Sequence, residues 1–458
     1  MSVAESQDHL SQDVFPVTRE AAKWVVELKA EDIPQDAFIR AKHALLDWFG
    51  VTIPGEAEPL TAILRDELEV GEGPCTLVAS GASAKVVDAV LINGAASHAL
   101  DYDDVNRDLH GHPTVCVAPA VLAVAEELGS SGKDVLVAHV AGNEISCRIG
   151  AMCGEEHYDR GFHATGTLGT LGAAAAAGKL MGLDEEQMAM ALGIAASQAA
   201  GIRVNFGTMT KPFHAGKSAA NGVLAARLAK RGFTAHDYAI EGEKGFAEAL
   251  APGFEAQPIR LSKDASWAVE NILYKFHASC YLTHASLNAI RSLYNEHGFK
   301  ADDVETAVVK VRTNHATVCC IPAPQTGLEI KFSLAHLAAM ALDGADTSAL
   351  ETFSDENALD PHFIETRERA VQLDFDPGID RNLSIVTITL KDGRVLQAEN
   401  SVRYPAEDHG EQWANLSTKF RALATPIIGA ENAETTLNLV ETLEQQGDVH
   451  GLMKASAG

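Results

Sequence analysis

Basic residues are scarce in this chain of 458 residues. It has 36 Lys and Arg against 63 Asp and Glu, which gives a formal net charge of −27. So acidic a surface repels nucleic-acid phosphates and anionic membranes, and we expect neither as a partner. If the ligand is itself an anion, the binding site must gather a local cluster of cations.

Paired cysteines are also absent. The seven cysteines are an odd number, none forms a Cys-x-x-Cys pair, and the adjacent Cys319 and Cys320 are poorly placed for an ordinary disulfide. This usage predicts a reducing compartment. The histidines lack the His-x-x-x-His spacing of a helical zinc site, so the sequence predicts no metal centre.

Long apolar runs are missing as well. No stretch of about 18 residues is free of charge and glycine, so we expect no membrane span. The polar, acidic segment 1–13 has neither the basic nor the apolar region of a signal peptide, and we expect a cytoplasmic protein. Phosphate-binding loops, kinase motifs and the G-x-S-x-G motif do not occur.

What the chain does contain predicts a mainly α fold of two or three domains. Over the first 250 residues, apolar side chains recur at helical spacing, and Asp184 with Gln187 forms a capping-box pattern. Residues 169–182 are almost all small, which predicts a central, tightly buried helix. Further helices are expected at 18–30, 34–50, 114–128 and 133–150.

The pattern changes after about residue 260. Residues 304–313 alternate like a half-buried strand, and Asp392–Gly393 lies between two apolar runs in the manner of a β-hairpin turn. The last 50 residues return to helical spacing. We therefore predict a large all-helical domain (1–265), an inserted smaller α/β lid domain (266–404) and a C-terminal return to the helical domain (405–458).

Two segments of the first half concentrate residue types that are typical of sites. In 97–123, His112 precedes a run of small apolar residues, and a histidine at a helix start tends to be neutral and able to act as a base. In 161–172, glycines at every third position could expose backbone N–H groups to a carboxylate beside His163. The alternatives are an acidic loop whose aspartates cap helices, and glycines that only allow close helix packing. The first segment also holds Asp101, Asp103, Asp104 and His110.

Two later segments add cations and a thiol. In 205–222, Lys211 precedes a proline and so should avoid the α region, which predicts an irregular turn that also carries His214. The lysine could hold a substrate carboxylate, or it could be an ordinary surface lysine. In 274–286, Cys280 near histidine could be a nucleophile, or a buried thiol beside a core histidine.

These four segments, in this order, resemble the MmgE/PrpD family over roughly residues 15–450. The most specific stretches are HALDYDDV with GHP, GFHATGTLGTLGAAAAAGKLMGL, GTMTKPFHAGKSAANG and TGLEIKFSLAH. Members of this family include 2-methylcitrate dehydratase, cis-aconitate decarboxylase and iminodisuccinate epimerase. The resemblance implies a helical domain with an α/β lid, a homodimer, and a pocket between the domains that uses neither metal nor organic cofactor.

The resemblance also implies site residues. Positions that match the family pocket, and that we assign to catalysis, are Asp101, His112, His163 and Lys211. Candidates for substrate binding are Lys275, Asp104, His214, Ser279 and Cys280.

Three departures count against cis-aconitate decarboxylation. Cys280 falls where the decarboxylase has a catalytic histidine, Val105 stands in place of a pocket threonine, and no tyrosine lies near Val318. The stretches NFGTMTKP and TGLE-x-KFS look more like the epimerase branch.

The expected reaction is removal of a proton next to a carboxylate in a small di- or tricarboxylic acid. Lys211 and Lys275 would hold the carboxylates, and His112 or His163 would take the proton while Asp101 orients a histidine. Loss of a hydroxyl would make the protein a dehydratase-like lyase. Return of the proton to the opposite face would make it an epimerase of an iminodisuccinate-like dicarboxylate. Cis-aconitate decarboxylase and a non-catalytic binding protein are further alternatives.

Overall fold

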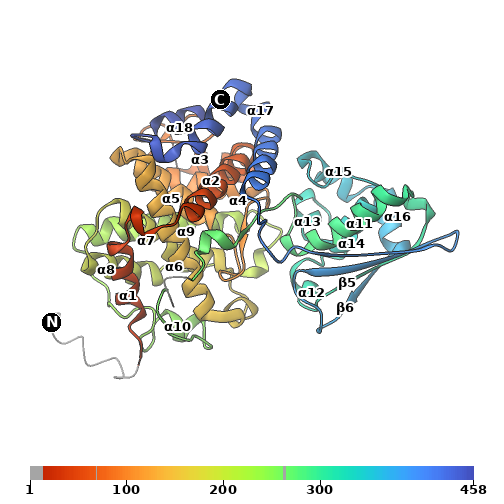
Figure 1. Ribbon diagram of the computed structural model, residues 1–458, viewed down its shortest axis with the longest axis horizontal. Coiled ribbons are helices and arrows are strands. Elements are labelled where there is room, and N and C mark those ends of the chain that lie inside the picture. The colour runs from red at the N-terminus through yellow and green to blue at the C-terminus, as the bar shows by residue number, and fades with distance from the viewer. Residues whose placement is uncertain (1–13, 69, 261–264) are drawn as a thin grey trace.

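The computed structural model describes residues 14–68, 70–260 and 265–458. A large body of helices lies beside a smaller body in which helices pack on a sheet (Figure 1). The predicted mainly α fold class is confirmed, since 59% of the structure is helical and 10% is strand. No helix in these ranges is long and apolar enough to cross a membrane. The segment in which we expect no signal peptide lies outside the described residues.

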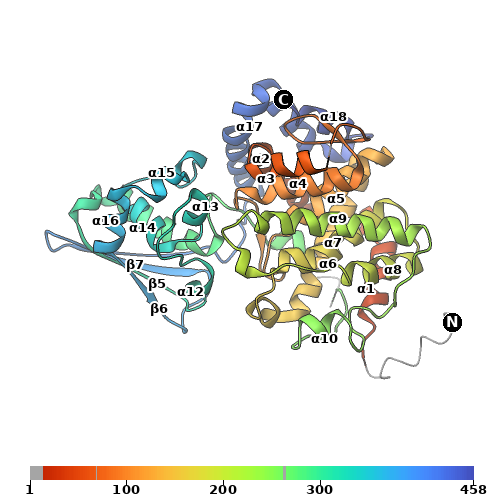
Figure 2. The ribbon, with the colours of Figure 1, turned by 180° about the vertical axis from the view of Figure 1, so that it is seen from behind.

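The helical body is formed by the first half of the chain together with its end. At its centre α4 (Val86–Ala99), α7 (Ala164–Leu180) and α9 (Thr210–Lys230) pack on one another, and α17 (His409–Glu441) packs along α2 (Gln35–Gly55). Both views show this return of the C-terminal segment (Figures 1 and 2). The domain boundaries at 265 and 404 stay predictions. The other helices are α1 (Val17–Glu27), α3 (Pro59–Glu67), α5 (Thr114–Leu128), α6 (Gly132–Asp159), α8 (Glu185–Ala196), α10 (Phe246–Leu250) and α18 (His450–Ala455).

Small residues let the central helices approach closely. A Cβ atom added to Gly94 on α4 would lie 2.8 Å from the Cα atom of Gly216 on α9. A Cβ atom on Gly172 of α7 would lie 2.6 Å from the carbonyl oxygen of Gly142 on α6. Any side chain at these positions would push the helices apart. The central buried helix predicted at 169–182 is therefore confirmed as the main part of α7. The capping box of Asp184 and Gln187 is also present.

The smaller body is built on a four-stranded sheet with the order β6–β5–β7–β8. β6 (Val371–Phe375) is parallel to β5 (Val304–Val311), and the other pairs are antiparallel. The predicted hairpin joins β7 (Leu383–Leu390) to β8 (Val395–Ser401), and Gly393 in its turn has a φ of +89°. The helices of this body are α11 (His284–His297), α12 (His315–Val318), α13 (Gly327–Ile330), α14 (Leu334–Leu342), α15 (Asp355–Ala358) and α16 (Pro361–Ala370).

One expectation about the backbone is wrong. Lys211 and Pro212 do not form an irregular turn, because α9 begins at Thr210 and both residues lie in its first turn. Proline is tolerated there, since the first N–H groups of a helix have no partner within the helix. His214 lies about one turn further along α9 and is therefore helical too.

A short strand pair brings distant segments together. β3 (Val105–Asn106) follows α4 and pairs with β4 (Ile272–Leu273), which lies just before Lys275. Elsewhere β1 (Cys75–Thr76) pairs with β2 (Ser83–Ala84). The β3–β4 pair places the loop after α4 beside the segment that connects the two bodies.

Candidate active site

A cavity of about 420 Å³ lies where the two bodies meet. Its wall on the helical body comes from the loop after α4, from the C-terminal part of α6 and from the N-terminal ends of α7 and α9. The opposite contribution comes from residues that connect the bodies or belong to the smaller one, namely 273, 275, 280–282, 312, 318, 332 and 380–382.

Two lysines converge on one carboxylate in this cavity. The Nζ atom of Lys211 lies 2.6 Å from Asp101 Oδ1, and the Nζ atom of Lys275 lies 2.9 Å from the same oxygen. All three residues are buried. Burial alone would raise the pKa of Asp101, but the two ammonium groups outweigh it and hold that pKa well below its usual range. Two ammonium groups share this one carboxylate, and three arginines also line the cavity, so an acidic chain can still bind an anion there.

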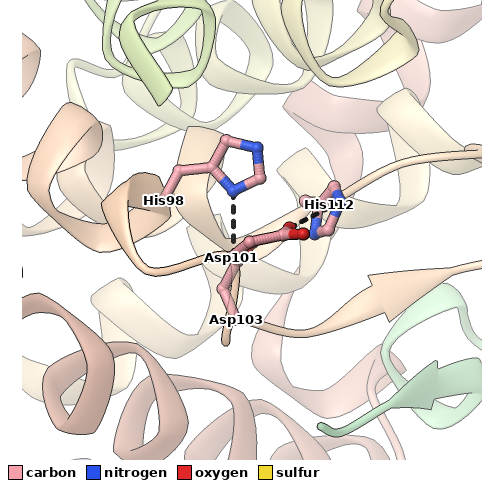
Figure 3. A group of neighbouring side chains, drawn as sticks. All are labelled: His98, Asp101, Asp103 and His112. Carbon is pink, nitrogen blue, oxygen red and sulfur yellow. Dashed lines mark hydrogen bonds and ion pairs between the residues drawn. The ribbon is translucent and has the colours of Figure 1, made fainter. Parts of the chain in front are cut away.

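A second aspartate holds two histidines (Figure 3). Asp103 Oδ1 lies 2.9 Å from His98 Nδ1, and Asp103 Oδ2 lies 2.8 Å from His112 Nδ1. Burial would raise the pKa of Asp103, but the two histidines lower it well below its usual range, so the carboxylate is ionised. Asp103 therefore contacts Nδ1 of His112, whereas Asp101 Oδ1 lies 3.9 Å from Nε2 of the same ring. The expectation that Asp101 orients a histidine stays a prediction.

These contacts define the tautomer of His112. Its Nδ1 atom also lies 2.9 Å from the carbonyl oxygen of Asp104. Because both oxygens around Nδ1 can only accept hydrogen bonds, Nδ1 carries the ring proton and Nε2 keeps its lone pair. Burial lowers the pKa of His112, while Asp103 opposes this effect. A neutral imidazole with a lone pair beside the cavity is suited to accept a proton.

The same group offers four possible metal ligands. One ligand atom each from His98, Asp101, Asp103 and His112 lies within 4.8 Å of the others. The donor set does not suit a cation, however, because Asp101 is paired with two ammonium groups and both oxygens of Asp103 face imidazole nitrogens. A metal ion would be repelled at short range by Lys211 and Lys275. The absence of a metal from the reaction stays a prediction.

A third histidine lines the cavity at the start of α7. His163 is buried, and its Nδ1 atom lies 3.0 Å from Nδ1 of His214. Its Nε2 atom has no hydrogen-bond partner among the described residues. Burial, and then the charge of Lys211, lowers the pKa of His163 well below its usual value, so the ring is neutral. His214 does not line this cavity and supports His163 from behind.

A thiol lines the cavity from the segment that leads into α11. Cys280 is buried there, and Cys319 is close enough to affect its ionisation. The thiol of Cys319 stabilises the Cys280 thiolate and lowers the pKa of Cys280, although burial acts in the opposite direction. Val105 and Val318, two positions at which we expect departures from the decarboxylases, line the same cavity.

Arginines form a second, more accessible group of cations. Arg107, Arg312 and Arg381 line the cavity, and each is at least partly exposed. Arg381 lies 3.3 Å from His110 Nδ1 and stacks over the ring of Tyr158 at 5.4 Å. These side chains are suited to hold a carboxylate at some distance from the lysine pair.

Most of the predicted site residues line this one cavity, and a few do not. Those that do are Asp101, His112, His163, Lys211, Lys275 and Cys280. Of the others, Asp104 accepts a hydrogen bond from the Thr114 hydroxyl at the start of α5, and Ser279 pairs with Thr283 at 2.9 Å. The roles of all these residues stay predictions.

Sequence reasoning missed several neighbours of the cavity. His98 lies at the end of α4, three residues before Asp101, and its place in the same motif could have pointed to it. Arg312 follows β5 and Arg381 precedes β7. They come together only because these strands are antiparallel neighbours, which no local pattern reveals.

The fold and the cavity define a mainly helical protein of two bodies, with a pocket between them that is lined by two lysines and three arginines. Residues 19–259 match the MmgE/PrpD N-terminal domain, and residues 277–445 match the MmgE/PrpD C-terminal domain. The chain therefore belongs to the MmgE/PrpD family, and the resemblance seen in the sequence is confirmed.

Three curated relatives of this chain are named as cis-aconitate decarboxylases or as a protein like them. Cis-aconitate decarboxylase of Aspergillus terreus is 32% identical over 60% of this chain and 60% of its own length. Human cis-aconitate decarboxylase is 27% identical over 94% of this chain and 92% of its length. The cis-aconitate decarboxylase-like protein oryM of Aspergillus oryzae is 28% identical over 96% of this chain and 97% of its length. The match thus spans about three fifths of the Aspergillus terreus relative.

Proposed function

We propose that this chain is a lyase that removes a proton next to a carboxylate in a small di- or tricarboxylic acid. The observation that carries the proposal is the His112–Asp103 pair, which leaves an unprotonated Nε2 beside a cavity that holds Lys211 and Lys275. Carbon acids next to a carboxylate need both a base and fixed positive charge for the electron pair that forms.

In this mechanism each group has a separate task. Substrate carboxylates bind to the lysine pair and, for a longer acid, to Arg381. His112 Nε2 takes the proton from carbon, Asp103 stabilises the imidazolium, and the C–H electron pair moves into the enolate. The enolate then expels a hydroxyl group from the neighbouring carbon as the double bond forms. Because the low pKa of His163 makes it a poor acid, we assign protonation of that hydroxyl to the ammonium group of Lys211. His163 Nε2 would hydrogen-bond the same hydroxyl.

Cis-aconitate decarboxylation is the second candidate, because the relatives that match carry this name. Three positions count against it. This chain has Cys280, Val105 and Val318 where the resemblance implies that the decarboxylases have a histidine, a threonine and, near the third position, a tyrosine. Epimerisation of an iminodisuccinate-like acid needs the same base and a second group that returns the proton to the opposite face. The ammonium group of Lys211 is the candidate for that group too, because the low pKa of His163 makes it a poor acid.

The test is proton NMR in D2O with citrate-like, aconitate-like and iminodisuccinate-like acids. New alkene signals from a hydroxy acid, lost in His112→Gln, support the lyase. Loss of CO2 from cis-aconitate supports the decarboxylase, and deuterium with inverted configuration supports the epimerase. Absence of exchange with every acid, together with stabilisation by one of them in a thermal-shift assay, would indicate a binding protein and overturn the proposal.

A further inference from the structure

Three consecutive main-chain carbonyl groups, those of residues 100–102, each accept a hydrogen bond from a different buried lysine. Lys331 donates to the Leu100 oxygen, Lys275 to the Asp101 oxygen at 2.7 Å, and Lys419 to the Tyr102 oxygen at 2.8 Å. We call these three lysines the lysine clamp. All of them are at least nine-tenths buried.

The lysine clamp joins three distant parts of the chain. Lys331 follows α13 in the smaller body, Lys275 lies in the connecting segment, and Lys419 lies on α17. Lys419 also donates to Asp47 Oδ1 at 2.7 Å and to the carbonyl oxygen of Lys275 at 2.9 Å. Both bodies therefore hold the loop after α4 through main-chain contacts.

The clamped loop has an unusual backbone conformation. Asp101 has a φ of +50°, in the left-handed region that residues other than glycine rarely occupy. Such a conformation persists only where the surroundings enforce it. In this conformation Asp101 directs its Oδ1 atom to both Lys211 and Lys275.

Lys331 and Lys419 themselves do not line the cavity. Burial lowers the pKa of Lys331 to about 8, and Asp101 and Glu58 only partly offset this effect. Apart from the Leu100 carbonyl, the ammonium group of Lys331 faces the ring of Phe353 at 4.9 Å. Burying an ammonium group with so few polar partners costs folding free energy. We therefore infer that Lys331 has a role other than adding charge to the surface.

We propose that Lys331 and Lys419 are positioning residues for the reaction. They fix Asp101 in its left-handed conformation and thereby fix the distance between the two lysines that bind the substrate. Neither touches the substrate, so each acts through the loop at 100–102. This inference rests on the proposed function for its kinetic consequence, but its structural consequence is independent of any substrate.

The kinetic test compares Lys331→Met and Lys419→Met with Lys179→Met. Lys179 is a matched control, because its Nζ atom also donates to two main-chain carbonyls, those of Val26 and Leu28, at 2.9 and 2.6 Å. We expect both clamp variants to lower kcat by roughly tenfold to a hundredfold with KM changed far less, as for a displaced catalytic group. Lys179→Met should lower Tm without changing kcat or KM.

The structural test is a crystal structure of each clamp variant. We expect Asp101 to leave the left-handed region and to lose one of its two lysine contacts. If Asp101 keeps its conformation and both contacts in a variant that folds, the proposal is overturned, whatever the activity. If the wild-type protein turns over no acid but Asp101 moves, the proposed function fails while the positioning role stands. Because Lys331 and Lys419 lie in different bodies, failure of one variant to fold leaves the other to decide.

Discussion

The two walls of the cavity differ in how tightly their polar groups are held. On the helical body, Asp101, Asp103, His112 and Lys211 are buried or nearly so and have short contacts with one another. On the other side, Lys275 is fully buried and paired with Asp101, but Arg312 and Arg381 are partly exposed and share their wall with a thiol and a valine. Fixed groups are suited to proton transfer, which depends on geometry, whereas exposed arginines are suited to select among substrates.

This difference follows from what lies behind each wall. The first wall is the edge of a body whose central helices are packed backbone to backbone, so its loops rest on a rigid support. The second wall consists largely of the ends of strands and short helices. We therefore expect changes on the first wall to affect kcat and changes on the second to affect KM.

The largest expected effect is on the helical wall. Lys211→Met removes a charge that stabilises the enolate, the proposed proton donor, and one partner of Asp101. We expect kcat to fall by about a thousandfold. Steady-state kinetics measures this, with Lys217→Met, an exposed change on the same helix, as the control. A kcat within threefold of the wild-type value would show that Lys211 does not take part in the reaction.

Acid should destabilise the helical body through its buried histidines. Burial lowers the pKa of His43, His98 and His139 to about 3, whereas unfolded histidine titrates near 6.5. Below about pH 6.5 these histidines bind protons in the unfolded state but stay neutral in the folded state. Each such histidine then costs about 1.4 kcal/mol of unfolding free energy per pH unit, and above that pH the effect disappears.

Urea unfolding at pH 7 and pH 5 measures this effect. Trp24, Trp48, Trp267 and Trp413 all pack in the helical body, so their fluorescence reports on it. Carboxyl groups whose pKa values burial raises act in the opposite direction, and in the described part of this body they are Glu20, Asp47, Glu58, Asp104 and Glu241. They are fewer than the eight histidines of the same body whose pKa values are lowered, which are His43, His98, His110, His112, His139, His157, His163 and His214. Equal midpoints at the two pH values would contradict the expectation.

The smallest effect is expected on the second wall. Arg381→Ala removes a cation that can hold a distal carboxylate but leaves the base and the lysine pair in place. We expect KM to rise roughly tenfold with kcat within threefold, as for the loss of one charged hydrogen bond to the substrate. Arg394→Ala, on the exposed hairpin turn, is the matched control. A fall in kcat with unchanged KM would contradict the expectation that changes on the second wall affect KM and changes on the first affect kcat.

The sequence predicted those features that depend on neighbours along the chain. The turn at Asp392–Gly393 and the capping box of Asp184 were predictable because each depends on a few adjacent residues. The irregular turn predicted at Lys211–Pro212 was wrong. The rule that a residue before proline avoids the α region does not hold in the first turn of a helix, where both residues lie.

The candidate site was predictable only in part. Asp101, Asp103 and Asp104 lie within four residues of one another, yet they face two lysines, two histidines and a threonine respectively. Spacing in an irregular loop does not say in which direction each side chain points. The direction depends on partners such as Lys275 and Thr114, which the fold brings together.

The contact of Lys419 with the loop at 100–102 has a consequence for synthesis of the protein. Tyr102 and Asp47 are made early, but their shared lysine lies on α17, near the end of the chain. At roughly 5–20 residues per second, tens of seconds separate the two ends on the ribosome. Throughout that time the helical body lacks the helix that covers α2, and the loop with Asp101 lacks one of its supports. The growing chain therefore carries an incomplete site until α17 emerges, and we expect a chain that ends before α17 to be less active and less stable than the full-length protein.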